Sequence, residues 1–536
     1  MSDATKPSGL ALAHMWIAFL LFAVAALLGL YQVLERAELI PVWDLGYYSS
    51  VTSHGAIMGF VLTTLFISGF GYYTAATSLK MEVPMKGVAW LGWILMVGGS
   101  VLAAVFMLTG QAAVLFTFYP PLTAHVGFYI GATLLVVGSW LWVLVMIVMM
   151  GQWKKANPGQ VVPLAMFGTA INALLWFWTS LGVAIEVLTQ IIPLALGLVD
   201  TIDVGLARTL FSWTLHPIVY FWLLPAYITL YTIVPKAAGG RLISDEMARI
   251  AFIMLVVFGL PIGFHHLYMD PFQAEGWKIL HMVGTMLVAI PTMITGFTVI
   301  GSLEIAGRLR GGKGLFGWIS KVDWSQPVVL AAGFAMLMLT IGGFGGLINA
   351  SYSLNVVVHN TQWVTGHFHL IFGGTVVIMY MGAAYYIWPS VTGKELASLG
   401  RARTQLWLWF IGMCTLTLPW HALGLQGQPR RTAFSPYATE FVQSWWTAEY
   451  LMVLGGAILV LSAVLFVFNL AIGGGPAASR EVEYAEAVHQ PVSLPNSLNG
   501  FTLWNWIIAI SMIVAFGYPV AQFWMMPTYD PVMWGF

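Results

Sequence analysis

Thirteen mostly apolar stretches, each long enough to cross the ~30 Å hydrocarbon core of a bilayer, follow one another along the 536 residues. Charged residues make up 8% of the chain, whereas a soluble domain carries roughly 25%. The sequence therefore predicts an all-α integral membrane protein of about 13 transmembrane helices, with residues 1–536 forming one domain. We expect the helices near residues 14–34, 50–76, 87–109, 122–150, 163–196, 206–235, 248–270, 277–305, 327–350, 358–390, 402–425, 445–473 and 499–526.

Lysine and arginine are distributed unevenly between the two sides of this predicted bundle. Sixteen of the 21 lie at the N-terminus or in loops that follow even-numbered helices. The five on the other side are Arg36, Arg208, Lys278, Arg430 and Arg431. Because cytoplasmic loops carry the excess of basic residues, we expect a cytoplasmic N-terminus and an external C-terminus. The net charge is zero and there is no basic tail, so no nucleic-acid partner is expected.

Six histidines from four of these helices fall at one depth, in the outer third of the predicted membrane. Two of them, His265 and His266, are expected in the last turns of the helix at 248–270. A single membrane histidine can be an ordinary packed core residue. Six at one depth favour a buried metal site, because ionisable groups in the membrane are costly and neutral imidazole is the commonest protein metal ligand. The six are His54, His216, His265, His266, His367 and His369.

The number of histidines matches a site with three metals. His216, His265 and His266 could give three nitrogens to one copper, zinc or non-haem iron ion with an open position. Three histidines remain, which is the number needed by one haem with two axial ligands and one with a single ligand. His367 and His369 point about 200° apart on their helix, so each could serve a different haem.

Three other residues bear on the chemistry. Tyr220 follows His216 by four residues and shares its helical face, so it can reach the same metal or simply pack through its ring. Cys414 is the only cysteine, which excludes a two-cysteine copper centre within this chain. Glu186 is a costly intramembrane acid, and the sequence suggests no role for it.

Five segments in order along nearly the whole chain resemble one family. They are HPIVYFWLLPAYITLYTIVPK (216–236), PIGFHHLYMDP (261–271), SLEIAGRLRGGKGLFGWI (302–319), HNTQWVTGHFHL (359–370) and PRR (429–431). These motifs are long and specific. The chain resembles subunit I of the haem–copper oxidase superfamily, and in particular its B-type, ba3-like branch.

The resemblance implies a role for each candidate ligand. His54 and His369 would bind the iron of a low-spin haem b, and His367 the iron of a high-spin haem of a3 or related type. The copper ion CuB would be held by His216, His265 and His266, with Tyr220 covalently joined to His216 as a donor of an electron and a proton. Haem propionates would be contacted by Arg430 and Arg431, with His359 and Asn360 nearby. An alternative is that His359 and Asn360 only cap the start of a helix.

The resemblance also implies a proton path and shows departures from the family pattern. The path would comprise Tyr227, Tyr231, Thr292 and Thr295, running from Tyr220 toward the cytoplasm. Ile218 stands where A-type relatives have glutamate, which argues against their second proton channel. Leu215 replaces a usual glycine beside His216, where a bulkier side chain could reshape access to the metal. Asn355 stands where a relative can have aspartate near a propionate, which argues against a proton-loading carboxylate at that position.

As a whole, the resemblance implies a terminal respiratory oxidase in a prokaryotic inner membrane, with its haems near the outer face. It would reduce O2 to water with electrons from a cytochrome c-type donor, take up protons and pump them. A subunit II carrying CuA, a small single-helix subunit and membrane lipids would be its partners. The alternatives are a nitric oxide reductase of the same superfamily, or a di-haem electron carrier or ion transporter. The lack of acidic residues between Trp213 and Tyr227 argues against the reductase.

Overall fold

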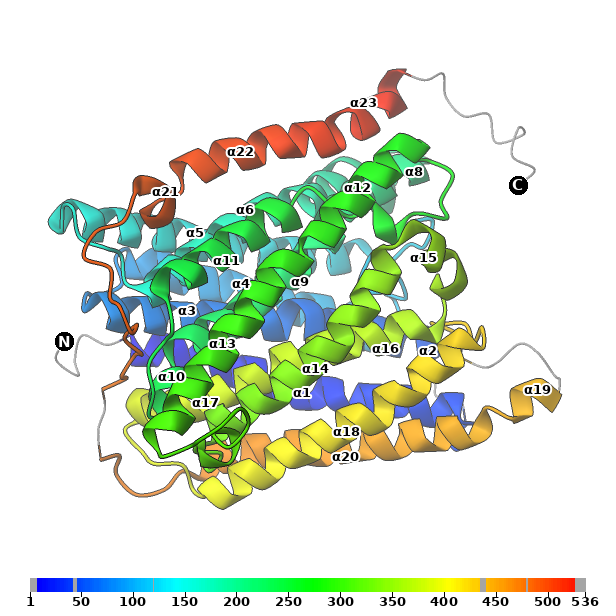
Figure 1. The fold of residues 1–536 in the computed structure, drawn as a ribbon. Coiled ribbons are helices and arrows are strands. Elements are labelled where there is room, and N and C mark those ends of the chain that lie inside the picture. Colours follow the sequence, from blue (N-terminus) through cyan, green and yellow to red (C-terminus); the bar gives the residue numbers. More distant parts are fainter. Residues whose placement is uncertain (1–6, 42–45, 119, 434–439, 479–480, 526–536) are drawn as a thin grey trace.

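Long helices run roughly parallel to one another through the whole molecule (Figure 1). The computed structural model describes residues 7–41, 46–118, 120–433, 440–478 and 481–525. Within these residues the regular structure is helical apart from isolated β-bridges, which confirms the all-α prediction. Twelve helical stretches in the described part are long and apolar enough to cross a membrane, one fewer than the thirteen expected.

The first half of the bundle contains helices up to the histidine-bearing turn. A π-helical segment, in which the turn is wider, interrupts two of them. The elements are α1 (Ser8–Arg36), α2 (Tyr47–Ala56), η2 (Ile57–Leu62), α3 (Thr63–Leu79), α4 (Lys86–Leu108), α5 (Val126–Ala156), α6 (Leu164–Glu186), η3 (Val187–Ile191), α7 (Ile192–Ala195), α8 (Val204–Leu215), α9 (Pro217–Thr232), α10 (Val234–Ala237), α11 (Asp245–Gly259) and η4 (Phe264–His266).

The second half completes the bundle and ends in a helix on its outside. In Figure 1 this last helix, α22 to α23, covers one side of the bundle. The elements are α12 (Glu275–Leu287), α13 (Ala289–Leu309), η5 (Ile319–Lys321), α14 (Pro327–Ala350), α15 (Tyr352–Val358), α16 (Gln362–Ile371), η6 (Phe372–Val377), α17 (Ile378–Thr392), α18 (Leu399–Leu425), α19 (Glu440–Gln443), α20 (Trp446–Ile472), α21 (Asn496–Asn499), α22 (Thr502–Met512), η7 (Ile513–Gly517) and α23 (Tyr518–Met525).

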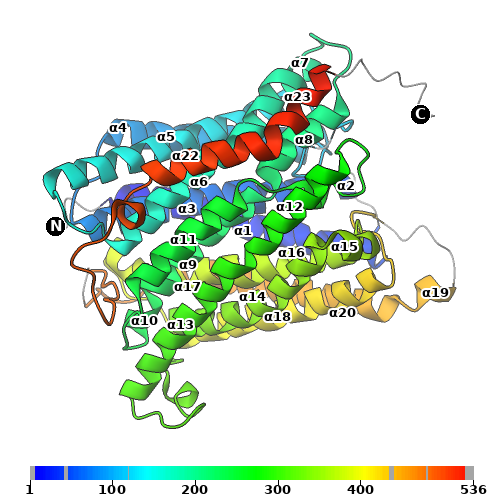
Figure 2. The ribbon, with the colours of Figure 1, turned by 45° about the horizontal axis from the view of Figure 1, so that its top comes forward.

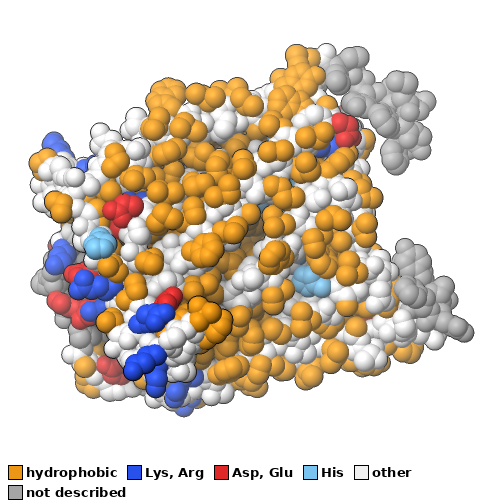
Figure 3. Space-filling model, in the orientation of Figure 1, with side chains coloured by type: hydrophobic (Ala, Val, Ile, Leu, Met, Phe, Trp, Pro, Cys, Tyr) orange, Lys and Arg blue, Asp and Glu red, His pale blue; other side chains and the backbone are white. Residues whose placement is uncertain are grey.

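The surface and the interior follow the pattern of a membrane bundle. The face in Figure 3 is largely apolar, and most of its charged side chains gather at the end where α1 begins. The end of α13 and the segment after it project from the bundle in Figure 2. The spans α2–α3, α8–α10 and α16–α17 are the most deeply buried. Three of the four predicted ligand-bearing helices therefore lie in the centre, shielded from lipid by the others.

The structure corrects the prediction for residues 248–270. Helix α11 is capped by the Ser244 hydroxyl, which accepts from the Met247 N–H, and it ends at Gly259 after 15 residues. Pro261 explains the early end, because proline lacks an N–H and clashes with the preceding turn of a helix. His265 and His266 consequently lie in the short 3₁₀ turn η4, not in the last turns of a membrane helix.

Candidate metal centre

All six predicted histidine ligands line one cavity of about 790 Å³ in the middle of the bundle. They come from four separate elements. His54 lies in α2, His216 at the junction of α8 and α9, His265 and His266 in η4, and His367 and His369 in α16. The cavity also contains Tyr220, one helical turn below His216 on α9.

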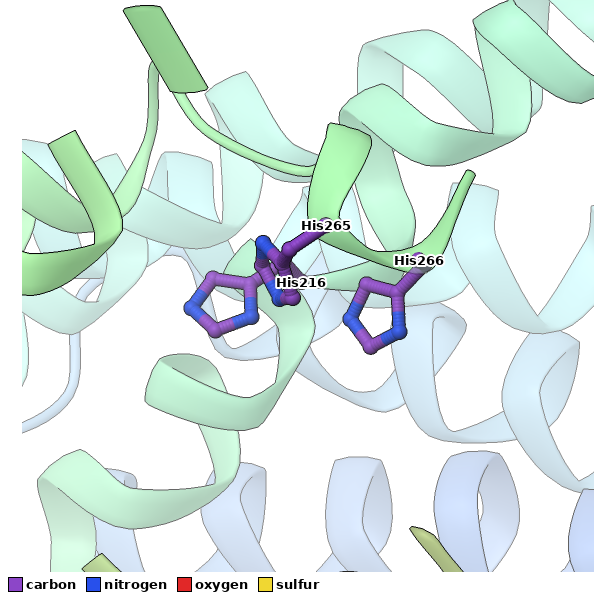
Figure 4. A group of neighbouring side chains, drawn as sticks. All are labelled: His216, His265 and His266. Atoms are coloured by element: carbon purple, nitrogen blue, oxygen red, sulfur yellow. The ribbon is translucent and has the colours of Figure 1, made fainter. Parts of the chain in front are cut away.

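Three of these histidines converge on one point, as Figure 4 shows for His216, His265 and His266. Each offers a nitrogen, and the three nitrogens all lie within 4.8 Å of one another. The Nε2 atom of His266 is buried and has no hydrogen-bond partner among the described residues. A buried imidazole nitrogen without a partner is costly unless something binds it. The donor set therefore fits a metal ion that prefers imidazole, such as copper, zinc or iron.

Hydroxyl groups next to His216 and His265 bear on which of their ring nitrogens is left for a metal. His216 Nε2 lies 2.6 Å from the Tyr220 hydroxyl oxygen. If Nε2 donates this bond, Nδ1 keeps the lone pair that a metal requires. The Thr285 hydroxyl donates to the His281 carbonyl oxygen at 2.6 Å and lies 3.2 Å from His265 Nδ1. Because a hydroxyl has one proton, Thr285 accepts from His265 Nδ1–H, which leaves Nε2 of His265 for a metal.

A second pair of histidines faces across the cavity. The rings of His54 and His369 are nearly parallel, with an interplanar angle of 11° and centroids 6.3 Å apart. Each ring donates Nδ1–H to a backbone carbonyl at 2.8 Å, Ala25 for His54 and Thr365 for His369. Their Nε2 atoms remain for a ligand. With metal–imidazole bonds of roughly 2 Å, this separation accommodates one metal between the two rings.

The space beside His54 depends on a glycine. A Cβ atom added at Gly29 of α1 would lie 3.0 Å from His54 Cε1. Real Cβ atoms rarely approach a neighbour so closely. Because the His54 ring is bonded to the Ala25 carbonyl, it could accommodate such a Cβ only by rotating. Gly29 also lines the cavity. Gly29 therefore leaves the His54 ring the room to hold a metal-bearing group together with His369.

His367 faces another part of the cavity from the same helix as His369. Its Nδ1 donates to the Gly342 carbonyl of α14 at 2.8 Å, and a Cβ at Gly346 would lie 3.0 Å from its Cε1 atom. His369 packs instead against Trp420 of α18, with ring centroids 4.7 Å apart. One face of α16 thus presents a histidine toward α14 and the other toward α18, as the two-residue spacing predicts.

The predicted propionate contacts lie together at one rim of the cavity. His359, Arg430 and Arg431 line the cavity, and Asn360 accepts from Arg430 Nη2 at 2.9 Å. Burial, and secondarily the Arg430 cation, lowers the pKa of His359 to about 4, so this imidazole is neutral at physiological pH. His359 and Asn360 do not cap α16. That position belongs to Thr361, whose side chain accepts from the Trp363 N–H.

Sequence reasoning did not assign a site role to Arg36. This residue is 6% exposed and lines the cavity near the same rim. Its Nη2 donates to the Pro429 carbonyl at 2.8 Å, and its Nε lies 3.9 Å from the Glu449 carboxylate. The signal in the sequence was that Arg36, like Arg430 and Arg431, is one of the few basic residues on the predicted outer side. Arg36 therefore adds a buried guanidinium to the cavity lining, with the Glu449 carboxylate close to it.

The predicted proton-path residues are brought together in part. Tyr231 and Thr295 share a hydrogen bond of 2.6 Å, and Thr295 donates to the Pro291 carbonyl at 2.8 Å, so it accepts from the tyrosine. Thr292 lines the cavity and donates to its own helix at Val288. The Tyr227 hydroxyl is buried with no hydrogen-bond partner among the described residues. The side chains that interact with this hydroxyl are those of Thr292 and Thr295.

The structure also locates two departures from the family pattern, Leu215 and Asn355, and the intramembrane acid Glu186. Leu215 lines the cavity beside His216. Asn355 lines it too, and donates to the Asn349 carbonyl at 2.6 Å and the His265 carbonyl at 3.3 Å. Glu186 is fully buried at the end of α6, and neither of its carboxylate oxygens has a partner among the described residues.

Comparison with known proteins agrees with this geometry. The model of the family described as cytochrome C and quinol oxidase polypeptide I matches residues 9–461. Cytochrome c oxidase subunit 1 of Thermus thermophilus is 39% identical over 531 residues, which cover 94% of this chain and 93% of that protein. The subunit 1 of a Synechocystis species is 27% identical over 462 residues, covering 79% of this chain and 75% of that one.

A solved structure with the same fold is also similar in sequence. A heme-copper terminal oxidase dimer, determined by cryo-EM, matches with a TM-score of 0.92 and 36% identity. The match covers 97% of this chain and 93% of that chain. The resemblance predicted from the motifs is therefore confirmed. This chain belongs to the cytochrome c and quinol oxidase polypeptide I family and is a subunit I of the haem–copper oxidases.

Proposed function

We propose that this chain is the catalytic subunit of a B-type, ba3-like terminal oxidase that reduces O2 to water. The observation that carries the proposal is the single cavity lined by all six histidines, three of them with nitrogens within 4.8 Å of one another. An electron carrier would use the His54–His369 pair, but it would not explain why His216, His265 and His266 cluster. An ion transporter would explain neither the facing pair nor the trio.

The proposed cofactors follow the two kinds of histidine arrangement. His54 and His369 would hold a low-spin haem b, His367 a high-spin haem of a3 or related type, and the trio the copper ion CuB. When bound, the high-spin haem and copper would supply the binding and four-electron reduction of O2. The protein fixes the ligand nitrogens through Ala25, Thr365 and Gly342 carbonyls and through the Thr285 hydroxyl.

Tyr220 and the polar groups below it would deliver protons to this site. Its hydroxyl contacts His216 Nε2, so a proton on the tyrosine is next to the proposed copper ligands. We propose that this tyrosine, covalently joined to His216 in the mature protein, gives an electron and a proton. Tyr227, Thr292 and the hydrogen-bonded pair of Tyr231 and Thr295 would bring protons from the cytoplasm, and pumping would accompany this uptake.

The environment and partners of the subunit are part of the same proposal. The 536 residues would form one catalytic domain in a prokaryotic inner membrane, with a cytoplasmic N-terminus and haems near the outer face. Cys414 is the only cysteine, so a CuA centre would lie on a subunit II that receives electrons from a cytochrome c-type donor. Arg36, Arg430 and Arg431 would bind haem propionates, and lipids and a small single-helix subunit would complete the complex.

Metal and haem quantification of the purified complex tests the proposal. We expect two haems and one CuB copper per copy of this chain, beyond any copper on a partner subunit. The reduced-minus-oxidised spectrum with and without CO should show that one haem binds CO and the other does not. Iron in place of CuB would support a nitric oxide reductase. If neither haem binds CO, a non-catalytic electron carrier would be the remaining interpretation.

A further inference from the structure

A buried histidine outside the six candidate ligands supports the histidine turn from behind. His281 of α12 is 0% exposed and is absent from the cavity lining. Its Nδ1 accepts from the Phe264 backbone N–H at 3.3 Å, and its Nε2 lies 3.1 Å from the Ala515 carbonyl oxygen. Because a carbonyl can only accept, Nε2 carries the proton and the imidazole is held as one neutral tautomer. Both ring nitrogens are therefore engaged by the backbones of two other elements.

The Ala515 carbonyl is available because of a proline in the last helix. In a regular α-helix this carbonyl would accept from the N–H four residues later, which is the position of Pro519. Proline has no N–H, and the helix widens into η7 over Ile513–Gly517 just before it. His281 supplies the donor that Pro519 cannot. The C-terminal helix is thereby attached to α12 at the depth of the metal centre.

The ring of Phe264 is held as firmly as its backbone. It stacks on the His281 imidazole with centroids 3.8 Å apart and an interplanar angle of 6°. The Phe516 ring meets both edge-on, at 5.1 Å from His281 and 5.4 Å from Phe264. Phe264 is the residue directly before His265. One turn further along α12, Thr285 contacts the His265 ring itself, so α12 controls both the backbone and the side chain of the turn.

We propose that His281 is a positioning residue that fixes the η4 turn so that His265 and His266 present their nitrogens to the metal. The Ala515 carbonyl, freed by Pro519, in turn fixes His281. This inference rests on the proposed function, in which the trio holds copper. Without His281 the Phe264 N–H and the Ala515 carbonyl would both lose their partner in a buried site, and the turn would relax.

Three substitutions at position 281 separate the two hydrogen bonds. His281→Phe keeps the stacking area and removes both bonds. His281→Asn places an amide oxygen near the position of Nδ1, so it can still accept from Phe264. His281→Gln reaches the Nε2 position and can still donate to Ala515. The matched control is His14→Phe in α1, since His14 is also 0% exposed and bonded to a backbone carbonyl, at Leu10, but does not line the cavity.

The measurement is the rate of copper loss from the purified complex during dialysis against a chelator, with the haem spectrum recorded in parallel. Changes in residues that orient metal ligands typically weaken binding 10- to 100-fold. We expect His281→Phe to lose CuB copper faster by roughly that factor, His281→Asn to recover most of the difference, and both haems to stay bound. His14→Phe should lose copper at the wild-type rate.

A substitution in the last helix tests the same contact from the other side. Pro519→Ala restores an N–H that competes for the Ala515 carbonyl, so copper loss should accelerate, though less than in His281→Phe. The double variant, with both His281→Phe and Pro519→Ala, should lose copper no faster than His281→Phe alone. Both substitutions disrupt the same hydrogen bond, between His281 and the Ala515 carbonyl. Wild-type copper loss in His281→Phe would overturn the inference and leave the proposed function intact. A wild-type complex without CuB copper would instead overturn the proposed function.

Discussion

The hydroxyl oxygen of Tyr220 in α9 lies 2.6 Å from Nε2 of His216, the residue directly before that helix. Pro217 begins α9 directly after His216, so the histidine sits at the start of a helix whose first turn carries the tyrosine. The contact is therefore local in sequence. It brings an ionisable hydroxyl to the edge of the three-histidine cluster without any help from tertiary packing.

Removal of this hydroxyl should stop turnover with little effect on assembly. In Tyr220→Phe we expect O2 consumption to fall by at least ~100-fold, the usual scale for losing a positioned proton donor. The haem and copper content should remain that of the wild type. Tyr72→Phe is the control, because the buried Tyr72 hydroxyl has no hydrogen-bond partner among the described residues and Tyr72 does not line the cavity. Equal rates in the two variants would contradict the proposed role.

The two histidines of α16 should give opposite spectral phenotypes. His369→Ala removes one of the facing pair, so we expect loss of the low-spin haem bands while CO still binds the remaining haem. His367→Ala should retain the low-spin bands and lose CO binding. The measurement is the CO difference spectrum of each purified variant. If both substitutions removed the same haem, the assignment of the two faces of α16 would be wrong.

A methyl group beside His54 should disturb only the low-spin site. Gly29→Ala places a Cβ 3.0 Å from His54 Cε1, so the ring must turn away from its present plane. We expect a lower content or a shifted band of the low-spin haem, with CO binding at the other haem unchanged. Gly98→Ala in α4 is the control, because a Cβ there meets no atom within 4 Å. Identical spectra for the two variants would show that the ring tolerates the methyl group.

The Tyr231–Thr295 hydrogen bond should matter for the rate of proton supply. Tyr231→Phe and Thr295→Val each remove one hydroxyl of the pair. We expect turnover to fall by roughly 10-fold or more in either variant, while reduction of the haems and CO binding stay normal. Thr415→Val is the matched control, since this half-buried threonine donates to the Ile411 carbonyl of its own helix. Turnover at the wild-type rate in both path variants would remove these residues from the proton route.

Part of the site could be predicted because it depends on periodicity and depth alone. Long apolar runs located the spans, and the positions of the histidines within them placed six imidazoles in one layer. The two-residue spacing of His367 and His369 determines that they leave α16 on different sides, whatever the neighbours. The prediction for residues 248–270 was wrong at its end, since hydropathy continues past Pro261 although the helix does not.

The supporting contacts could not be predicted from the sequence. In the sequence, Thr285 is an ordinary membrane threonine, and only the fold brings His265 to it. Arg36 is likewise an ordinary charge at a helix end until the fold brings the Pro429 carbonyl to it. His281 has the same depth as the six ligands, yet its partner Ala515 lies 234 residues away on a helix that only tertiary packing brings close. No local pattern distinguishes a histidine that binds a metal from one that holds the turn behind it.

Both proposed haem ligands of α16, His367 and His369, belong to one rigid helix, two residues and therefore about 3 Å apart along its axis. Any tilt or slide of α16 within the bundle moves His367 and His369 together. The gap that an electron must cross between the two proposed haems is thus determined by covalent chain geometry, and the packing of the eleven other membrane-spanning stretches in the described part of the chain has little influence on it. Since tunnelling slows steeply with distance, substitutions that loosen the bundle should cost thermal stability well before they slow electron transfer.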